Sequence, residues 1–291
     1  MGEMAGKICI VTGATSGIGK ATALGLARKG ATVVLICRNL SKAVTAACEI
    51  RALARNSAID ILVADLSSQH HIRAAAAAFI KKYQRLDVLI NNAGAMFPNR
   101  SESAEGIEMT LAVNHLAPFL LTNLLIEPMQ SAGAARIINV NSDAHETGQI
   151  DFADLQMRRR YGRGIGMRAY SNAKLANLLT VYELARKLSG TRITVNALHP
   201  GYVATDILRF HSATGPVRLL QPLWIAAKQF IRSPESGAAT SLYLASSPEA
   251  AAKTGKYFEK CVPVASSRDS YDRSLQRRMW AASEELIDGV R

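Results

Sequence analysis

Short apolar runs rich in β-branched residues alternate along the chain with longer segments whose apolar residues recur at helical spacing. The strand-like runs are Lys7–Val11, Thr32–Ile36, Ile59–Val63, Asp87–Ile90, Arg136–Val140 and Ile193–Leu198. The helical segments are Ala21–Lys29, Lys42–Leu53, Ile72–Tyr83, Thr110–Ile126 and Tyr170–Leu188. Strands that are apolar on both faces must be covered by helices on both sides. The alternation therefore predicts a single α/β domain over residues 1–291, a Rossmann-type doubly wound sheet of about seven parallel strands with helices on both faces.

Two segments interrupt this alternation, at about residues 151–168 and 206–233, and each follows a predicted strand. Ligands in such sheets bind beyond the carboxyl ends of the strands, so we expect both segments to be substrate loops. The second segment mixes bulky apolar residues with cations, at Leu208, Arg209, Arg218, Leu219, Leu220, Leu223, Trp224, Ile225, Lys228, Phe230, Ile231 and Arg232. This mixture is typical of an amphipathic lid, of a shallow membrane-surface helix or of ordinary packing, and its position after a strand favours the lid.

The composition, 48% hydrophobic and 20% charged over 291 residues, predicts that nearly all of the chain folds. The formal net charge of +12 could serve an anionic partner such as nucleic acid, a membrane surface or a phosphorylated ligand. The cations cluster only at Arg158, Arg159, Arg160, Arg163 and Arg168. Because no basic recognition helix with interleaved aromatic residues is evident, we interpret the cluster as a solvated loop and expect no nucleic-acid partner.

The cysteines indicate neither a disulfide framework nor a metal site. Cys9 and Cys37 fall inside apolar strand-like runs, where a free thiol behaves as a small hydrophobe, and Cys48 and Cys261 are unevenly spaced from them. Residues 1–6 are short and polar, and no later run approaches the roughly 20 apolar residues of a membrane span. We therefore expect a cytoplasmic protein without a transmembrane segment or a bound metal, and peripheral membrane contact is a compatible alternative.

A glycine turn joins the first predicted strand to the first predicted helix, with Gly13, Gly17 and Gly19 in the run TGATSGIG. Glycine adopts positive φ and lets the backbone approach a ligand closely, while a helix N-terminus offers free N–H groups to a pyrophosphate. A glycine turn alone also occurs in plain β-to-α connections. The order of strand, glycines and helix is typical of dinucleotide binding.

The end of the second predicted strand indicates which dinucleotide is bound. An NAD-binding chain usually places Asp or Glu there to hold the ribose 2′-hydroxyl, whereas this strand is followed by Arg38. The planar guanidinium of Arg38 matches a 2′-phosphate, so we expect NADP(H) in preference to NAD(H). A surface arginine that merely follows the strand is the alternative.

Tyr170 and Lys174 lie four residues apart on a predicted helix, which places both side chains on one face. A neighbouring ammonium favours a phenolate, so we expect Lys174 to lower the pKa of Tyr170 from its ordinary value of about 10. Such a pair is also common on exposed helices, but here Ser142 follows a predicted strand and Asn114 lies in the preceding long helix. A hydroxyl donor at Ser142 could hold a substrate oxygen as charge develops on it.

From about Lys7 to Phe258 the sequence resembles the short-chain dehydrogenase/reductase family. The resemblance is carried by Thr12-Gly-x-x-x-Gly-Ile-Gly19, Asp65–Leu66, Asn91–Asn92–Ala93–Gly94, Asn114, Ser142, Tyr170-x-x-x-Lys174 and Pro200–Gly201. It implies that Tyr170 is the general acid/base and that Ser142 clamps the substrate oxygen. It also implies that Lys174 both tunes Tyr170 and binds the ribose, and that Asn114 holds a water for proton relay.

The same resemblance implies a set of cofactor contacts. Asp65 would contact adenine, Asn92 would support the sheet edge beside the cofactor, and Thr205 would meet the nicotinamide carboxamide. The full implied set is Gly13, Thr15, Ser16, Gly17, Ile18, Gly19, Arg38, Asp65, Leu66, Asn92, Ala93, Gly94, Tyr170, Lys174, Pro200, Gly201, Val203 and Thr205. As alternatives, Asp65 caps the following helix and Asn92 only stabilises a turn.

Within the family, the sequence resembles the retinol dehydrogenase-like branch. The segments that carry this are Cys37–Arg38, Asn114–Leu116, Phe119–Thr122, Arg136–Asn139 and His199–Gly201. Two features depart from that branch, since no apolar N-terminal anchor is evident and Asn141–Ser142 stands where the branch has two serines. Family members form a four-helix dimer contact through the helices around Asn114 and Tyr170, so we expect a homodimer or homotetramer.

These expectations together describe an NADP(H)-dependent oxidoreductase, which acts as a carbonyl reductase or, in the reverse direction, oxidises an alcohol. It would move a hydride between nicotinamide and an apolar ketone or aldehyde, or the corresponding alcohol. No metal is needed because Ser142 and Tyr170 would polarise the carbonyl. The alternative is a catalytically silent NADP(H)-binding regulator or sensor, which predicts that the catalytic residues are lost.

Overall fold

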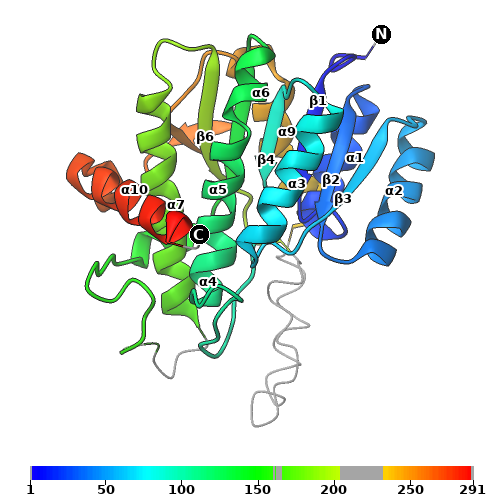
Figure 1. Ribbon diagram of the computed structural model, residues 1–291. Helices are drawn as coiled ribbons and strands as arrows, with labels where there is room; N and C mark the ends of the chain where they lie inside the picture. The colour runs from blue at the N-terminus through cyan, green and yellow to red at the C-terminus, as the bar shows by residue number, and fades with distance from the viewer. Residues whose placement is uncertain (1, 160, 162–165, 204–231, 290–291) are drawn as a thin grey trace.

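One eight-stranded sheet lies at the centre of the computed structural model, which describes residues 2–159, 161, 166–203 and 232–289 (Figure 1). Its order is β3-β2-β1-β4-β5-β6-β7-β8. The strands are β1 (Ile8–Thr12), β2 (Thr32–Cys37), β3 (Ile59–Val63), β4 (Val88–Asn91), β5 (Ala135–Val140), β6 (Ile193–His199), β7 (Lys256–Glu259) and β8 (Val262–Val264). The first seven pair in parallel and β8 pairs antiparallel with β7.

The predicted single-domain doubly wound α/β fold is confirmed, with eight strands where about seven were expected. Neither β7 nor β8 was among the six runs identified from the sequence. The second of them, β8, has three residues and contains Pro263. A strand this short carries no alternation to recognise, and proline is tolerated in it because it lies at the sheet edge.

Helices cover both faces of the sheet. One layer holds α1 (Gly17–Arg28), α2 (Leu40–Ala54) and α9 (Pro234–Ser246), which share a core cluster with the central strands. The other holds α3 (Gln69–Lys82), α5 (Ala117–Leu124) and α7 (Met167–Lys187), with α6 (Ile126–Ser131) after α5 and α10 (Arg273–Asp288) outermost. Because β1 pairs with β2 on one side and β4 on the other, the strand order reverses beside β1, which is where such sheets bind ligands.

The long helix expected over Thr110–Ile126 is composite. It begins as α4 (Met109–Leu111), widens into a π-helical turn, η1 (Ala112–Leu116), and continues as α5. Pro118 has no N–H to give to the carbonyl of Asn114 four residues earlier. That carbonyl instead accepts a hydrogen bond from Asn177 Nδ2 of α7 at 3.1 Å, so the π turn joins the two helices.

Helix α10, which was not expected from the sequence, covers the outer side of α7 and the π turn (Figure 1). Trp280 packs edge-on against Phe119 with ring centroids 4.8 Å apart, and Ser283 Oγ lies 2.7 Å from the buried His115 Nε2. Its C-terminal carbonyls at Leu286 and Ile287 accept hydrogen bonds from α3. Part of the surface of the helices around Asn114 and Tyr170, to which the family resemblance assigns a dimer contact, therefore packs against α10 of the same chain.

No helix within the described part of the chain combines the length and the apolar character that crossing a membrane requires.

Candidate active site

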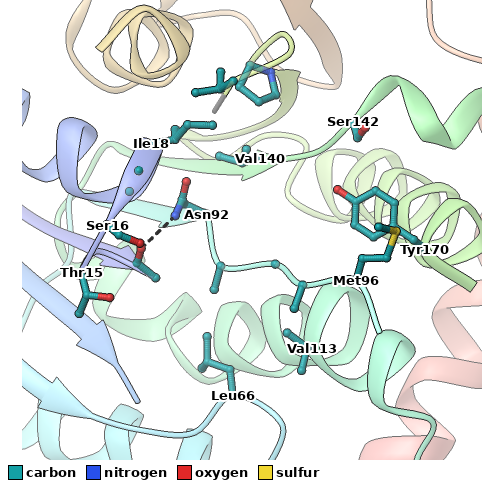
Figure 2. Close-up of a pocket in the computed structure, with 18 of the residues that line it drawn as sticks. Thr15, Ser16, Ile18, Leu66, Asn92, Met96, Val113, Val140, Ser142 and Tyr170 are labelled. Carbon is teal, nitrogen blue, oxygen red and sulfur yellow. Dashed lines mark hydrogen bonds between the residues drawn. The ribbon is translucent and has the colours of Figure 1, made fainter. Parts of the chain in front are cut away.

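A cavity of about 1260 Å³ opens at the carboxyl ends of the central strands. Every residue that the sequence analysis proposed for cofactor binding or catalysis lines it, apart from Asn114 and Thr205. Thr205 lies outside the described residues, as does the segment 206–233 up to residue 231. In Figure 2 the glycine turn with Thr15 and Ser16 lies on one side of this space, and Tyr170 and Ser142 lie on the other.

The glycine turn is fixed against the end of β4. Gly13 has φ +67°, a conformation that favours glycine, and a Cβ on Gly19 would collide with the carbonyl oxygen of Gly13 and with Asn92 Nδ2. Thr12 Oγ1 accepts hydrogen bonds from the backbone N–H groups of Asn92 and Ala93, both at 2.9 Å. Asn92 Nδ2 donates back to the Thr12 carbonyl at 2.8 Å, so the amide ties β4 to the turn.

Three cationic side chains line the cavity close to the end of β2 and the first turns of α1 and α2. Arg38 is exposed directly after β2, and Lys42 on α2 and Lys20 on α1 line the same mouth. Lys20 forms an ion pair with Glu49. Neither lysine belongs to the motifs that predicted the cofactor site. Lys42 follows Arg38 by four residues, and α1, which carries Lys20, packs beside α2.

Asp65 lines the cavity between the glycine turn and α3. Its Oδ1 accepts hydrogen bonds from the backbone N–H of Ser67 at 2.9 Å and from Ser67 Oγ at 2.8 Å. The cap of α3 is Ser68, so Asp65 stabilises the turn before that helix and does not cap the helix itself.

Tyr170 and Ser142 face each other at the inner end of the cavity (Figure 2). Tyr170 is 8% exposed, and burial raises its pKa to about 12. This direction is opposite to the sequence-based expectation. The phenol therefore holds its proton throughout the neutral range.

Lys174 lies beside Tyr170 without bringing the pKa of the phenol below its ordinary value. Its Nζ lies 5.4 Å from the centre of the Tyr170 ring and donates a hydrogen bond to the carbonyl of Val140 at 3.1 Å. Lys174 is 4% exposed, and burial lowers its pKa to about 8. The ammonium is thus placed over the ring, with its proton directed at a backbone carbonyl.

Asn114 does not line the cavity. Its Nδ2 donates to the carbonyls of Ala95 at 2.7 Å and Thr110 at 2.9 Å, and its Oδ1 accepts from the Ala95 N–H at 3.2 Å. The side chain thereby holds the loop after β4 against the π turn, and its backbone carbonyl is bound by Asn177.

The cavity wall beside Tyr170 is partly apolar and partly acidic. Met96, Phe97, Met109, Val113 and Met167 form the apolar part. Asp143, Glu146, His199 and Tyr202 lie on the polar part and were not identified from the sequence. Asp143 and Glu146 belong to a short 3-10 turn, η2 (Asp143–Thr147). Their closeness to Ser142 in the sequence is the one signal that could have identified them as residues of the site.

That residues 151–168 form a substrate loop stays a prediction, since residues 160 and 162–165 lie outside the described part of the chain. Among the described residues of this segment only Met167 lines the cavity. Phe152 and Leu155 instead pack with Leu175 and Met279 between α7 and α10. These apolar residues gain more by covering the two helices than by facing a water-filled mouth.

The described residues contain no cluster of three or more His, Cys, Asp or Glu side chains placed to hold a metal ion. Their four cysteines are all free.

A doubly wound sheet with a glycine turn at the reversal of strand order is an architecture that binds dinucleotides. The family model for short chain dehydrogenases matches residues 7–154. Retinol dehydrogenase 12 of Homo sapiens is 42% identical over 289 residues, which are 99% of this chain and 88% of that protein. The chain belongs to the short-chain dehydrogenase/reductase family and is similar to its retinol dehydrogenase branch.

Two solved structures extend the comparison. An uncharacterised protein of Mycobacterium paratuberculosis superposes with a TM-score of 0.78 at 32% identity, covering 98% of this chain and 94% of that one. RhlG of Pseudomonas aeruginosa, solved as an active-site complex with NADP, superposes with a TM-score of 0.67 at 28% identity, covering 87% and 94%. The family binds nicotinamide cofactors, and the residues around the cavity fit one: a helix N-terminus follows the glycine turn, and cations line the cavity close to the end of β2.

Proposed function

We propose that the protein transfers a hydride between NADP(H) and an apolar aldehyde or ketone, or the corresponding alcohol. In reduction the carbonyl carbon receives the hydride with its two electrons, and the carbonyl oxygen receives the proton of Tyr170. The observation that carries the proposal is the single cavity, which joins the glycine turn and Arg38 at one end to Tyr170, Ser142 and Lys174 at the other. The bound nicotinamide supplies the hydride, and the protein supplies binding, orientation and the proton.

The preference for NADP(H) rests on the charges at the cavity mouth. Arg38 and Lys42 are both exposed there, and no carboxylate follows β2 to hold a ribose 2′-hydroxyl. A guanidinium makes charge-assisted hydrogen bonds to phosphate oxygens, which favours the phosphorylated dinucleotide.

Tyr170 is suited to act as the acid in reduction. Because burial raises its pKa to about 12, the proton is present at neutral pH when a carbonyl oxygen becomes basic. The phenolate left behind is then stabilised by the ammonium of Lys174 over the ring. Ser142 lies beside the same hydroxyl, next to the place where the oxygen that Tyr170 protonates would bind.

The apolar part of the wall, with Met96 and Val113 in Figure 2, suits the hydrocarbon body of the substrate. Retinal and retinol form the first pair to test, because the curated relatives are retinol dehydrogenases. A panel of aldehydes, ketosteroids and quinones, each with NADPH and with NADH, defines the substrate class by the rate of cofactor oxidation.

Replacing Tyr170 by Phe tests the assignment. We expect kcat/KM to fall by about 100-fold or more, while NADPH binding is retained, because the proton donor is lost and the ring remains. Tyr243→Phe is the matched control, since that hydroxyl contacts Lys253 away from the cavity. Turnover that is unchanged in Tyr170→Phe would refute the proposal, and biological output without any turnover would support a sensor.

A further inference from the structure

The hydroxyl of Ser142 is committed to a neighbour that the proposed function does not use. Ser142 Oγ donates a hydrogen bond to Asp143 Oδ1 at 2.9 Å and accepts one from the backbone N–H of Ala144 at 3.2 Å. A serine hydroxyl has one proton to donate and two lone pairs that accept. With its proton on Asp143, Ser142 presents an acceptor to the rest of the cavity.

Asp143 is held as a carboxylate by its surroundings. Burial raises its pKa, but hydrogen bonds from Tyr202 and Ser142 outweigh burial and hold the pKa of Asp143 below its ordinary value. Tyr202 donates its hydroxyl to the second carboxylate oxygen, Oδ2. An ionised carboxylate only accepts hydrogen bonds. The hydroxyl of Ser142 therefore keeps donating to Asp143 unless another acceptor competes for its proton.

The backbone of Ser142 is also held in place. The direction in which its hydroxyl points is therefore fixed by a turn that is itself bonded to its surroundings. The carbonyl oxygen of Ser142 lies 2.7 Å from Nδ1 of the buried His145. His145 Nε2 accepts the backbone N–H of Ser267 at 3.1 Å, which assigns the ring proton to Nδ1. The turn that carries Ser142 and Asp143 is thereby bonded to the segment before α10.

An alcohol and a carbonyl differ in what they require of this serine. A carbonyl oxygen only accepts, so it takes the Ser142 proton only if the bond to Asp143 breaks. An alcohol hydroxyl can accept from Tyr170 and donate to Ser142 Oγ at the same time, leaving the bond to Asp143 intact. We propose that Asp143 is a positioning residue that orients Ser142 as an acceptor and makes the site bind the alcohol of a redox pair more tightly than its carbonyl. This inference rests on the proposed function and specifies the ligand preference of the same site.

The test compares affinities of one redox pair in non-reacting complexes. Retinol is titrated into protein saturated with NADPH, and retinal into protein saturated with NADP⁺, by calorimetry. We expect the wild-type protein to bind retinol about fivefold more tightly than retinal, the size of one net hydrogen bond. In Asp143→Ala the Ser142 proton is free, so retinal affinity should rise and the ratio should fall to about one or below.

Two further variants separate orientation from folding. Asp143→Asn keeps an oxygen acceptor without the charge, so its ratio should lie between those of the wild type and Asp143→Ala. Tyr202→Phe removes the other donor to Asp143 and leaves the Ser142 bond, so it should keep the alcohol preference. Tyr202 is 67% exposed, and its loss should leave the thermal midpoint nearly unchanged.

The outcomes distinguish this inference from the proposed function. A ratio in Asp143→Ala and Asp143→Asn equal to that of the wild type, in protein that turns over retinal, would overturn the role of Asp143 and leave the proposed function standing. Absence of NADPH-dependent turnover across the whole substrate panel in the wild type would overturn both.

Discussion

The two ends of the cavity are built in different ways. At the cofactor end the backbone forms the surface: Gly13 and Gly19 allow a tight turn, Thr12 and Asn92 brace it, and the ionic side chain Arg38 is exposed. At the catalytic end buried side chains form the surface, with Tyr170 and Lys174 each less than a tenth exposed.

This difference has an electrostatic consequence. Arg38 is exposed to water and salt, so its attraction to a phosphate is screened and moderate. Burial shifts the pKa of Tyr170 up to about 12 and that of Lys174 down to about 8. A small change in the burial of these two side chains therefore changes their protonation. Substitutions at the catalytic end should therefore affect the reaction most, and those at the cofactor end should affect cofactor choice.

The largest effect in this comparison is expected for Lys174→Met. Methionine fills much of the lysine's volume but leaves the Tyr170 phenolate without a neighbouring cation, so kcat/KM should fall by about 100-fold. Lys81→Met on the exposed end of α3 is the control. A loss under about threefold in steady-state kinetics would place the stabilising charge elsewhere.

Lys174 also gives the stability a dependence on pH. Its folded pKa of about 8 lies below that of an unfolded lysine, so between about pH 8 and 10 the unfolded chain binds more protons and the free energy of unfolding rises with pH. Above about pH 10 the folded Tyr170 keeps a proton that the unfolded chain loses, which reverses the trend. Urea unfolding gives the free energy of unfolding of the wild type and of Lys174→Met. The difference between them, wild type minus variant, should rise by about 2 kcal/mol from pH 8 to 10. A difference that is flat over this range would show that Lys174 is not buried as described.

A smaller and more selective effect is expected for Arg38→Ser. Loss of a charge-assisted bond to the 2′-phosphate should weaken NADPH binding by about tenfold or more and leave NADH binding within about twofold. Fluorescence titration of both cofactors measures the ratio, with Arg28→Ser on the far end of α1 as the control. If the binding of NADPH and of NADH were weakened equally, Arg38 would contact a part of the dinucleotide that the two cofactors share.

The cofactor end was also the easier part to predict from the sequence. The order of strand, glycines and helix fixes a backbone path, because Gly13 needs its positive φ and Gly19 has no room for a Cβ. The spacing of Tyr170 and Lys174 was equally readable, since four residues of helix place both on one face. Their pKa values were not readable, because they depend chiefly on how deeply the two side chains are buried.

The partners of Ser142 could not be predicted for a related reason. Tyr202 reaches Asp143 across 59 residues of sequence, and only the folded turns after β5 and β6 bring them together. Helix α10 did leave a pattern, since Leu275, Met279 and Ile287 recur at helical spacing. Its partner face on α7 becomes clear only once the layers are assembled.

The smallest effect on the reaction is expected for Trp280→Ala, although its effect on stability should be large. The indole packs on Phe119 and under Lys187 Nζ, so truncation leaves a cavity between α10 and α5 and should cost about 3–5 kcal/mol in urea unfolding. Trp280→Phe is the matched control, because it keeps an aromatic ring against Phe119. Turnover per folded molecule should stay within about twofold, since α10 braces α7 from the side away from the cavity. A loss of turnover as large as that of Lys174→Met would show that α10 sets the position of Tyr170, and the buried catalytic end would then include the outer helix layer.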